Sequence, residues 1–498
     1  MLDGAYIPKG VDDTFVAIRN ALMLGGSLVA TWSVALLVRL FLPRHLGPAL
    51  FGTFNFADTL AATCFVFTGL GLSTYIQKEV PVRPHHATDF FGGVLAVRVG
   101  LSALLFVAMA LLVWLGGRSL EVQRAVFIFG VSQLLVIING DLAALLHASR
   151  RVGRLAVLNV VSKIVWGGGI AVALSAGLGL EWLALASLVS EALRSIVLWR
   201  LARAHLELRM KLDVRALKAV VASSFPYYLN ALAFTLYAKV DISIMAFVSS
   251  DEEIGWYGSA QNFAAIAMLI APLIGWVIMP QFSRAASRST RELGEMLRRS
   301  IEWVISLSIP ISLLMGLGAD VWVRYVFGPA FTPAMTSVRV LAPIFVLTYL
   351  AMLTATYLIM VKRAWAVTLV SFATLVLNAL MNVLLVRWAQ RLLGQGGAGA
   401  AAASISIFTE ALVVAAFLAI IGKGAFDRRS VLSIGKSLAA CLVVAAMDWA
   451  IRPLGPARLL LDIALYVALV VSSNALRVRE MFDLIVAALA ARRGNARS

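Results

Sequence analysis

Charged residues are scarce in this chain of 498 amino acids, at 14% of the sequence, whereas an ordinary soluble domain carries about 25%. Hydrophobic residues make up 61%, and they occur in repeated long runs. A run of about 20 apolar residues is what an α-helix needs to cross the hydrocarbon core of a membrane. The composition therefore excludes a string of soluble domains and predicts an all-α polytopic membrane protein.

Residues that form disulfides or hold metals are also few. The two cysteines, Cys64 and Cys441, both lie in apolar runs, which excludes a disulfide framework. None of the five histidines stands near Cys, Asp or Glu at metal-ligand spacing, and no glycine-rich stretch carries the Lys-Ser/Thr of a phosphate-binding loop. The sequence thus predicts no metal site, no cofactor and no enzyme, and leaves open a coupling ion, Na⁺ or H⁺.

The apolar runs fit about 14 membrane-spanning helices. Of the 43 Lys and Arg residues, 29 fall in the chain ends and the even-numbered loops, and 10 fall in the odd-numbered loops. Because positively charged loops stay in the cytoplasm, this bias predicts that both termini are cytoplasmic. Membrane topology also explains the net charge of +17, which therefore does not indicate nucleic-acid binding. The expected spans are 14–42, 52–74, 90–115, 123–147, 155–177, 180–199, 220–248, 256–282, 302–326, 338–361, 364–388, 399–421, 431–450 and 457–473.

The expected helices divide into two pseudo-symmetric six-helix lobes and a final pair. A basic segment, 200–218, separates the first six helices from the next six, and many transporters are built from such repeats. The predicted limits are 1–218 for the N-terminal lobe (helices 1–6), 219–422 for the C-terminal lobe (helices 7–12), 423–476 for accessory helices 13 and 14, and 477–498 for a basic cytoplasmic tail.

Several basic residues fall inside or close to the ends of the expected helices. A charge inside the bilayer is costly, so each is a functional hypothesis by default. Their surplus in the first seven helices predicts a cationic cavity for an anionic passenger, because attraction is strong at low dielectric constant. Two alternatives stay open: long side chains can extend to the membrane surface, and a base three residues from an acid on one helix can be neutralised by it. The candidate cavity residues are Arg19, Arg98, Lys163, Arg194 and Lys239.

Acidic residues inside the expected helices are candidates for ion coupling or for pairing with these bases. They are Asp58, Asp141, Glu191, Asp241 and Glu410. Glu410 lies in the middle of its helix, so it needs a partner or a proton. Asp448 and Asp462 lie near the expected outer helix ends, and we predict that water solvates both.

Three short segments resemble parts of one family of membrane transporters. They are LGPALFGTFNFA (46–57), GLGLSTYIQKE (69–79) and GWYGSA (255–260). The first two resemble the start and end of the second helix, and the third resembles the start of the eighth helix, of bacterial polysaccharide-unit flippases. The chain is similar in helix number and layout to the Wzx-type O-antigen and exopolysaccharide flippases of the multidrug/oligosaccharidyl-lipid/polysaccharide exporter superfamily.

This resemblance implies two lobes around a V-shaped cationic cavity. It implies that undecaprenyl-diphosphate-linked oligosaccharide units cross from the inner to the outer leaflet of the bacterial cytoplasmic membrane by alternating access, for lipopolysaccharide or exopolysaccharide. A polysaccharide polymerase and a chain-length regulator are possible partners beside the lipid bilayer. Arg19 matches an arginine that recurs early in the first helix of lipid-linked relatives.

Two rival hypotheses remain. A cation-coupled multidrug antiporter of the same fold would use an acidic cavity, for which Asp58, Asp141, Asp241 and Glu410 are candidates. A membrane glycosyltransferase or polymerase would need a sizeable outer loop or a carboxylate pair, and the predicted topology has no long outer loop.

Overall fold

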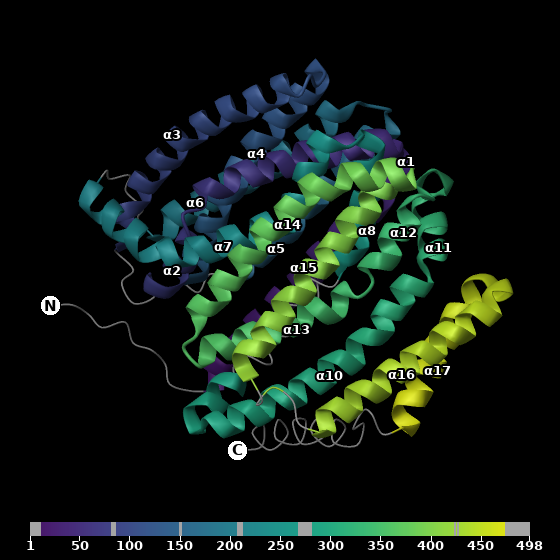
Figure 1. The fold of residues 1–498 in the computed structure, drawn as a ribbon. Coiled ribbons are helices and arrows are strands. Elements are labelled where there is room, and N and C mark those ends of the chain that lie inside the picture. The colour runs from purple at the N-terminus through teal and green to yellow at the C-terminus, as the bar shows by residue number, and fades with distance from the viewer. Residues whose placement is uncertain are drawn as a thin grey trace. The chain divides into compact units, whose positions relative to one another are not determined.

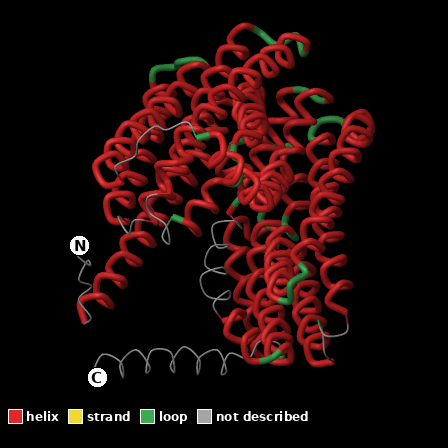
Figure 2. Tube along the Cα trace, turned by 90° about the vertical axis from the view of Figure 1, so that its left-hand side faces the viewer, coloured by secondary structure: helices red, strands yellow, loops and turns green. Residues whose placement is uncertain are grey.

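The computed structural model describes residues 11–80, 86–148, 152–206, 213–266, 281–422, 425 and 428–473. Every regular element in these ranges is a helix (Figure 2). An apolar chain folds in this way because a helix satisfies its backbone hydrogen bonds within one membrane-crossing segment. The predicted all-α polytopic class is confirmed. The chain forms two compact units, Met1–Gly255 and Trp256–Ser498.

The first unit is a bundle of long helices (Figure 1). Helix α4 packs against α1 and α6, helix α5 packs against α1 and α6, and α7 packs against α1, α2 and α3. Its elements are α1 (Val11–Phe65), η1 (Val66–Thr68), α2 (Leu72–Glu79), α3 (His86–Leu115), α4 (Leu120–Ala148), α5 (Val152–Ser175), α6 (Leu180–Leu206) and α7 (Val214–Val248), followed by the start of α8 (Asp251–Ala264).

Helix α1 contains the first two predicted helices, which meet at a kink and not in a loop. The interruption is Gly47, with φ 72° and ψ 170°, between Pro43 and Pro48. Glycine adopts such a φ without steric cost. The second predicted helix also ends earlier than expected, at Phe65, because the short turn η1 and the left-handed Gly71 (φ 64°) separate it from α2.

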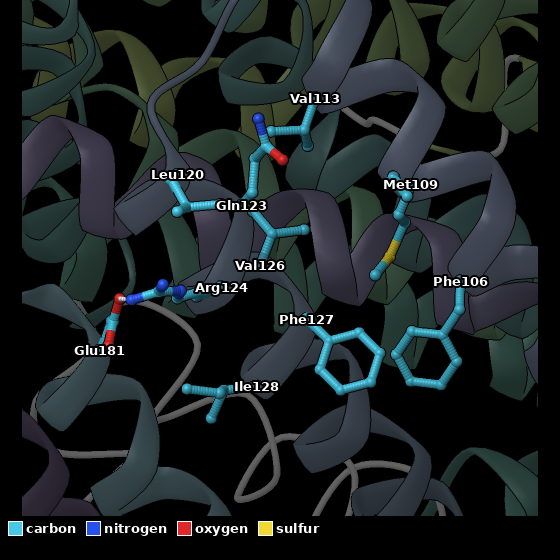
Figure 3. Close-up of a pocket in the computed structure, with 11 residues that line it drawn as sticks. Phe106, Met109, Val113, Leu120, Gln123, Arg124, Val126, Phe127, Ile128 and Glu181 are labelled. Carbon is cyan, nitrogen blue, oxygen red and sulfur yellow. Dashed lines mark hydrogen bonds and ion pairs between the residues drawn. The ribbon is translucent and has the colours of Figure 1, made fainter.

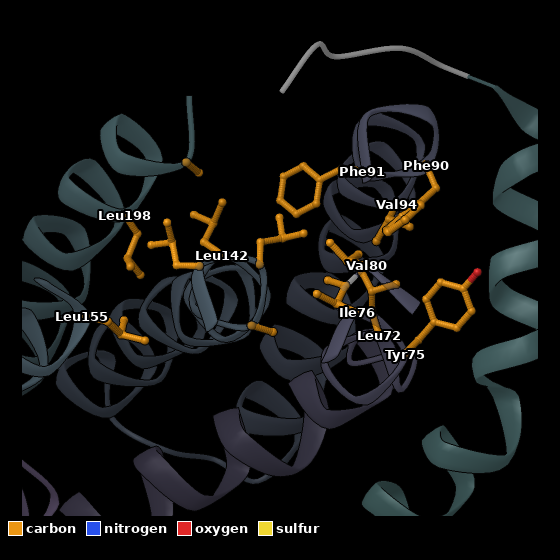
Figure 4. Close-up of a cluster of buried hydrophobic side chains, with 14 of the residues drawn as sticks. Leu72, Tyr75, Ile76, Val80, Phe90, Phe91, Val94, Leu142, Leu155 and Leu198 are labelled. Atoms are coloured by element: carbon orange, nitrogen blue, oxygen red, sulfur yellow. The ribbon is translucent and has the colours of Figure 1, made fainter. Parts of the chain in front are cut away.

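A buried apolar cluster joins α2, α3, α4, α5, α6 and α7 (Figure 4). Ile76 and Leu198 in this cluster are fully buried, as is Phe90. The ring of Tyr75 meets Phe90 edge to face, with centroids 5.8 Å apart, an arrangement that adds about 0.5–1.5 kcal/mol to simple burial. Close packing of this kind holds membrane helices together, since lipid tails are as apolar as the side chains.

Helix α1 and the start of α8 approach each other backbone to backbone. A Cβ on Gly52 would lie 1.7 Å from the carbonyl oxygen of Asp251, and a Cβ on Gly255 would lie 2.0 Å from the carbonyl oxygen of Pro48. Only glycine allows so close a contact at either position. The guanidinium of Arg118 reinforces it by donating a hydrogen bond of 2.6 Å to the Asp251 carboxylate.

The second unit is also helical. Helix α10 packs against α13, α16 and α17, and α15 packs against α12, α13 and α14. Its elements are the end of α8, then α10 (Thr290–Leu317), α11 (Ala319–Trp322), η2 (Val323–Phe327), η3 (Pro329–Phe331), α12 (Ala334–Leu341), α13 (Ile344–Met360), α14 (Ala364–Leu393), α15 (Gly397–Ile421), α16 (Arg428–Ile451), η5 (Arg452–Ala457) and α17 (Arg458–Ser472).

Two helices of this unit differ from their predicted bounds. The helix expected at 302–326 begins at Thr290, because Ser289 caps it by accepting a hydrogen bond from the Glu292 backbone N–H. Its polar first turns carry no apolar signal, so sequence alone missed them. The helix expected at 338–361 is divided at Pro343 into α12 and α13, since proline lacks the N–H that a continuous helix needs.

Ten stretches of the described residues are long and apolar enough to cross a membrane. Two of them, Gly25–Thr68 and Val431–Ser472, contain 44 and 42 residues, and each has room for the two helices predicted there, at about 20 residues per span. Helix α7 corresponds to one more, and residues 267–280 of the helix expected at 256–282 lie outside the described residues. The described part of the chain accommodates the other expected helices.

The compact units are not the same partition as the predicted lobes. Helix α7 was assigned to the lobe 219–422, and in the structure it belongs to the first unit because it packs on α1, α2 and α3. The lobe limits 1–218, 219–422 and 423–476 stay a prediction, and the whole tail 477–498 lies outside the described residues.

Candidate functional site

Six charged side chains from four helices gather in the first unit. The charges of Glu191, Arg39, Arg194 and Asp58 all act on Lys163. A sixth group joins them because the Lys239 Nζ lies 3.9 Å from Asp58 Oδ2. We call these residues the charged cluster: Arg39 and Asp58 on α1, Lys163 on α5, Glu191 and Arg194 on α6, and Lys239 on α7. With four bases and two acids, the cluster carries a surplus of positive charge.

Lys163 lies beside an aromatic ring. Its Nζ is 4.8 Å from the centroid of the Trp166 ring, and the Trp166 Nε1–H donates a 3.0 Å hydrogen bond to Ser187 Oγ, which fixes the ring. A cation over an aromatic face is stabilised by the ring quadrupole. This contact uses none of the ammonium N–H donors, and no hydrogen-bond acceptor for them is found in the described part of the chain. Lys163 is therefore held in place with its donors unused.

Glu191 and Arg194 form only a long ion pair, with Arg194 Nη1 3.7 Å from Glu191 Oε2. Glu191 is held more closely by Asn139, whose Nδ2 donates to its Oε2 at 2.8 Å, while Arg194 Nη2 donates to Asn159 Oδ1 at 3.0 Å. The Arg194 Nε–H is buried and has no hydrogen-bond partner among the described residues. Leaving such a donor unpaired costs about 1–3 kcal/mol, so this geometry favours a site for an external acceptor over simple mutual neutralisation.

Lys239 and Asp58 make a loose contact. Their side chains are 32% and 36% exposed, and Gln133 Nε2 donates to Asp58 Oδ1 at 3.4 Å. An ion pair at 3.9 Å between half-exposed groups contributes little to stability. Both side chains can therefore exchange this contact for a ligand at small cost.

Arg98 and Asp141 lie away from the charged cluster and form a buried ion pair, with side chains 2% and 0% exposed. The Arg98 guanidinium also donates to the carbonyls of Thr68 and Gly69, at 2.9 Å each. Ser73 Oγ donates to the Asp141 carboxylate at 2.8 Å. Because these carbonyls belong to the break after α1, where helical partners are missing, the contacts favour a structural role. The predicted roles of both residues stay predictions without support from this geometry.

The other predicted residues are placed as follows. Arg19 belongs to α1, but its side chain lies outside the described residues. Asp241 on α7 is buried, and so is Glu410, which lies on α15 in the second unit. The prediction that Asp448 and Asp462 are solvated is wrong, since each is only 3% exposed. Helices α10, α16 and α17 pack together there and remove both carboxyl groups from water.

Sequence reasoning missed several members of this site. Arg39 lies within α1 but is not among the predicted cavity residues. Asn139 and Asn159 carry no charge, so a prediction from buried charges does not include them. An amide inside an apolar run also needs a hydrogen-bond partner in a membrane, and that signal could have found both.

A separate cavity of about 420 Å³ lies between α3, α4 and the start of α6 (Figure 3). Apolar side chains such as Phe106, Met109 and Phe127 dominate its lining, and Arg124 and Glu181 pair at 3.3 Å beside it. None of the predicted site residues lines it. Its apolar lining does not suit a multiply charged ligand.

Comparison with known proteins identifies the family. Residues 41–336, more than half of the chain, match the model of a family described as polysaccharide biosynthesis protein. The chain belongs to this family. This polysaccharide biosynthesis protein is 24% identical over 366 residues to the probable low-salt glycan biosynthesis flippase Agl15 of Haloferax volcanii. The alignment covers 70% of this chain and 72% of that protein.

Solved structures share the fold. The lipid II flippase MurJ in an inward closed conformation aligns with a TM-score of 0.72 at 12% identity, over 93% of this chain and 100% of that chain. An inward-facing multidrug resistance MATE family transporter aligns with a TM-score of 0.60 at 15% identity, over 80% of this chain and 98% of that chain. The resemblance predicted from the sequence is confirmed, and the protein is a multi-pass membrane protein.

Proposed function

We propose that this polysaccharide biosynthesis protein moves undecaprenyl-diphosphate-linked oligosaccharide units from the cytoplasmic to the outer leaflet of the bacterial inner membrane by alternating access. Its family and the glycan flippase that it resembles support transport of a glycan precursor. The observation that carries the proposal is the charged cluster, which combines surplus positive charge with unused donors on Lys163 and Arg194.

The chemistry of the carrier suits this cluster. A diphosphate that links two organic groups carries about two negative charges at neutral pH, because its acidic oxygens ionise below pH 7. Moving such a group through the bilayer without a partner is costly. The lysine and arginine donors offset that cost through charge-assisted hydrogen bonds to phosphate oxygens. The prenyl chain stays in lipid while the head group crosses.

Alternating access requires contacts that close and open. In this proposal the approach of Gly52 to the start of α8 is a contact of this kind, because the missing side chain of Gly52 lets the two backbones meet and the hydrogen bond from Arg118 to Asp251 forms when they do. In this proposal both termini are cytoplasmic, no bond of the substrate is made or broken, and a polymerase and a chain-length regulator act on the flipped unit. The coupling ion, Na⁺ or H⁺, belongs to the same proposal.

A deletion strain tests the assignment. Lys163→Met and Arg194→Met should abolish surface polysaccharide and cause lipid-linked precursor to accumulate in the inner leaflet, at unchanged protein level. The matched control is Arg124→Met, because Arg124 is 60% exposed and lies outside the charged cluster. Intact polysaccharide in both cluster variants, together with increased drug sensitivity of the deletion strain, would contradict the proposal and favour a drug antiporter.

A further inference from the structure

The last two helices of the second unit enclose a group of charges that the charged cluster does not include. Arg458 is only 4% exposed, at the start of α17. Its Nη2 donates to Asp320 Oδ1 at 2.6 Å and to the Leu317 carbonyl at 3.1 Å. Its Nε lies 2.8 Å from Asp448 Oδ1, on α16. One buried guanidinium therefore faces two carboxylates from two other helices, α11 and α16.

A third carboxyl group completes this arrangement. Asp462 lies one helical turn after Arg458 on α17, so both side chains share a helix face. Asp462 is 3% exposed, and in the part of the chain that the structure describes neither of its carboxyl oxygens has a hydrogen-bond partner. Its charged neighbours are Asp448 and Arg458. Asp462 thus points a buried carboxyl group at another carboxyl group.

The charges do not balance if all three acids are ionised. Three aspartates and one arginine would leave a net charge of −2 in a mostly buried site, and the guanidinium is already directed at Asp320 and Asp448. Two buried carboxylates side by side repel each other strongly, so the pair holds a proton or another cation. A shared proton also gives the carboxyl oxygens of Asp462 a hydrogen-bond partner, because the protonated carboxyl group donates to the other one.

We propose that Asp448 and Asp462 form a proton-binding site that fastens α17 to α16. This site is independent of the transported substrate. A proton suits the pair better than a metal ion, because Na⁺ takes several oxygen ligands and no group of three or more acidic, His or Cys side chains suited to a metal is found among the described residues.

The surroundings of the pair make its proton occupancy matter for stability. Asp320, on α11, is the remaining acid of the group, and it is 38% exposed. The neighbouring face of α10 contributes uncharged groups, such as the Ser306 carbonyl that accepts from Tyr466 at 3.4 Å. No further base of the described chain is placed against Asp462, so loss of the shared proton leaves a repulsion that weakens the contact between α16 and α17 (Figure 1).

The pH dependence has a definite sign. In the unfolded chain an aspartate ionises near pH 3.9, whereas the folded pair keeps one proton to higher pH. Between these two values the folded state binds more protons, so stability falls as the pH rises through the value at which the pair releases its proton. The full-length protein in lipid nanodiscs should therefore lose thermal stability as the pH rises from about 4 to neutral, and no further above that. Asp462→Asn, which keeps the shape and removes the titrating proton, should abolish this part of the loss.

Infrared difference spectroscopy on the wild type provides a second readout that does not depend on a variant that folds. A carbonyl stretching band of a protonated carboxylic acid should be present at mildly acidic pH and disappear at alkaline pH, and it should be absent in Asp462→Asn. Glu295→Gln is the control, because the Glu295 side chain is 44% exposed and pairs with Arg291. The control should keep both the band and the pH-dependent melting of the wild type.

Two outcomes would overturn the proposal. One is a wild-type spectrum without a protonated carboxyl band at mildly acidic pH, together with identical pH profiles of melting for wild type and Asp462→Asn. The other is stabilisation of the wild type, and not of Asp462→Asn, by NaCl relative to choline chloride at equal ionic strength, which would identify Na⁺ as the occupant.

Discussion

Replacing Arg98 by methionine separates the structural bases of this protein from those proposed to bind substrate. Methionine keeps much of the length of the side chain and removes the charge and all N–H donors. The change leaves the Asp141 carboxylate, which is 0% exposed, with Ser73 as its remaining donor. It also leaves the Thr68 and Gly69 carbonyls at the break after α1 without the donor that serves them now.

The expected loss of stability is large. Removing one partner of a buried ion pair costs about 3–5 kcal/mol, because the other charge is left uncompensated. Replacing both partners by apolar residues is often close to neutral. The double variant Arg98→Met with Asp141→Leu should therefore recover much of the stability that Arg98→Met loses. Lys163→Met should cost little, because the structure gives the Lys163 ammonium only an aromatic contact.

Thermal or denaturant unfolding of purified protein in detergent measures these differences, with protein level in the membrane as a second readout. Arg98→Met should melt well below the wild type, the double variant should lie between them, and Lys163→Met should match the wild type. If Arg98→Met unfolds like the wild type and loses transport while Lys163→Met loses stability, the division into structural and binding bases is refuted.

Two further positions give sharp expectations. Gly52→Ala places a Cβ 1.7 Å from the Asp251 carbonyl oxygen, so the contact between α1 and α8 no longer closes and we expect transport to fall at least about tenfold. The control Gly294→Ala should be neutral, because a Cβ there meets nothing within 4 Å. Equal transport by both variants would contradict the expectation. Burial alone would raise the pKa of Asp320, but the hydrogen bond and charge of Arg458 outweigh it and lower that pKa. A carboxyl group with a lowered pKa stabilises the folded state above its pKa in the unfolded chain, near 3.9, and this stability is lost as the pH falls through its pKa in the folded state. Asp320→Asn should therefore be less stable than the wild type at neutral pH and equally stable in acid. Denaturant unfolding at the two pH values measures the difference.

Much of the architecture was predictable because the membrane imposes it. Long apolar runs dictate helices, and the basic loops dictate their orientation. The kink at Gly47 was not predicted, since the segment between Pro43 and Pro48 has the composition of a loop. The chain is helical on both sides of Gly47, whose own backbone is not helical, and hydropathy does not record so local an interruption.

Part of the candidate site was predictable for the same reason. Lys163, Arg194 and Lys239 were noted because charges stand out in apolar runs, and the structure brings them together with two acids. The pairing of Arg98 with Asp141 could not be predicted, because 43 positions separate them and no spacing rule links two different helices.

In α16 and α17, the position of a residue near a helix end did not predict its exposure to water. Asp448 and Asp462 lie near helix ends, which predicted contact with water. The turn η5 instead folds α17 back on α16, so both carboxyl groups face the Arg458 guanidinium or each other in a buried site.

The central claim is that the charged cluster carries a lipid-linked diphosphate across the membrane. The most direct measurement reconstitutes the purified protein in liposomes with a fluorescent oligosaccharide on undecaprenyl diphosphate and follows its transfer between leaflets by quenching from outside. The wild type should transfer the lipid, and the double variant Lys163→Met with Arg194→Met should transfer it at least about tenfold more slowly, in proportion to the lost charge-assisted hydrogen bonds. Equal transfer by the wild type and the double variant, or no transfer by the wild type beyond that of protein-free liposomes, would contradict the account.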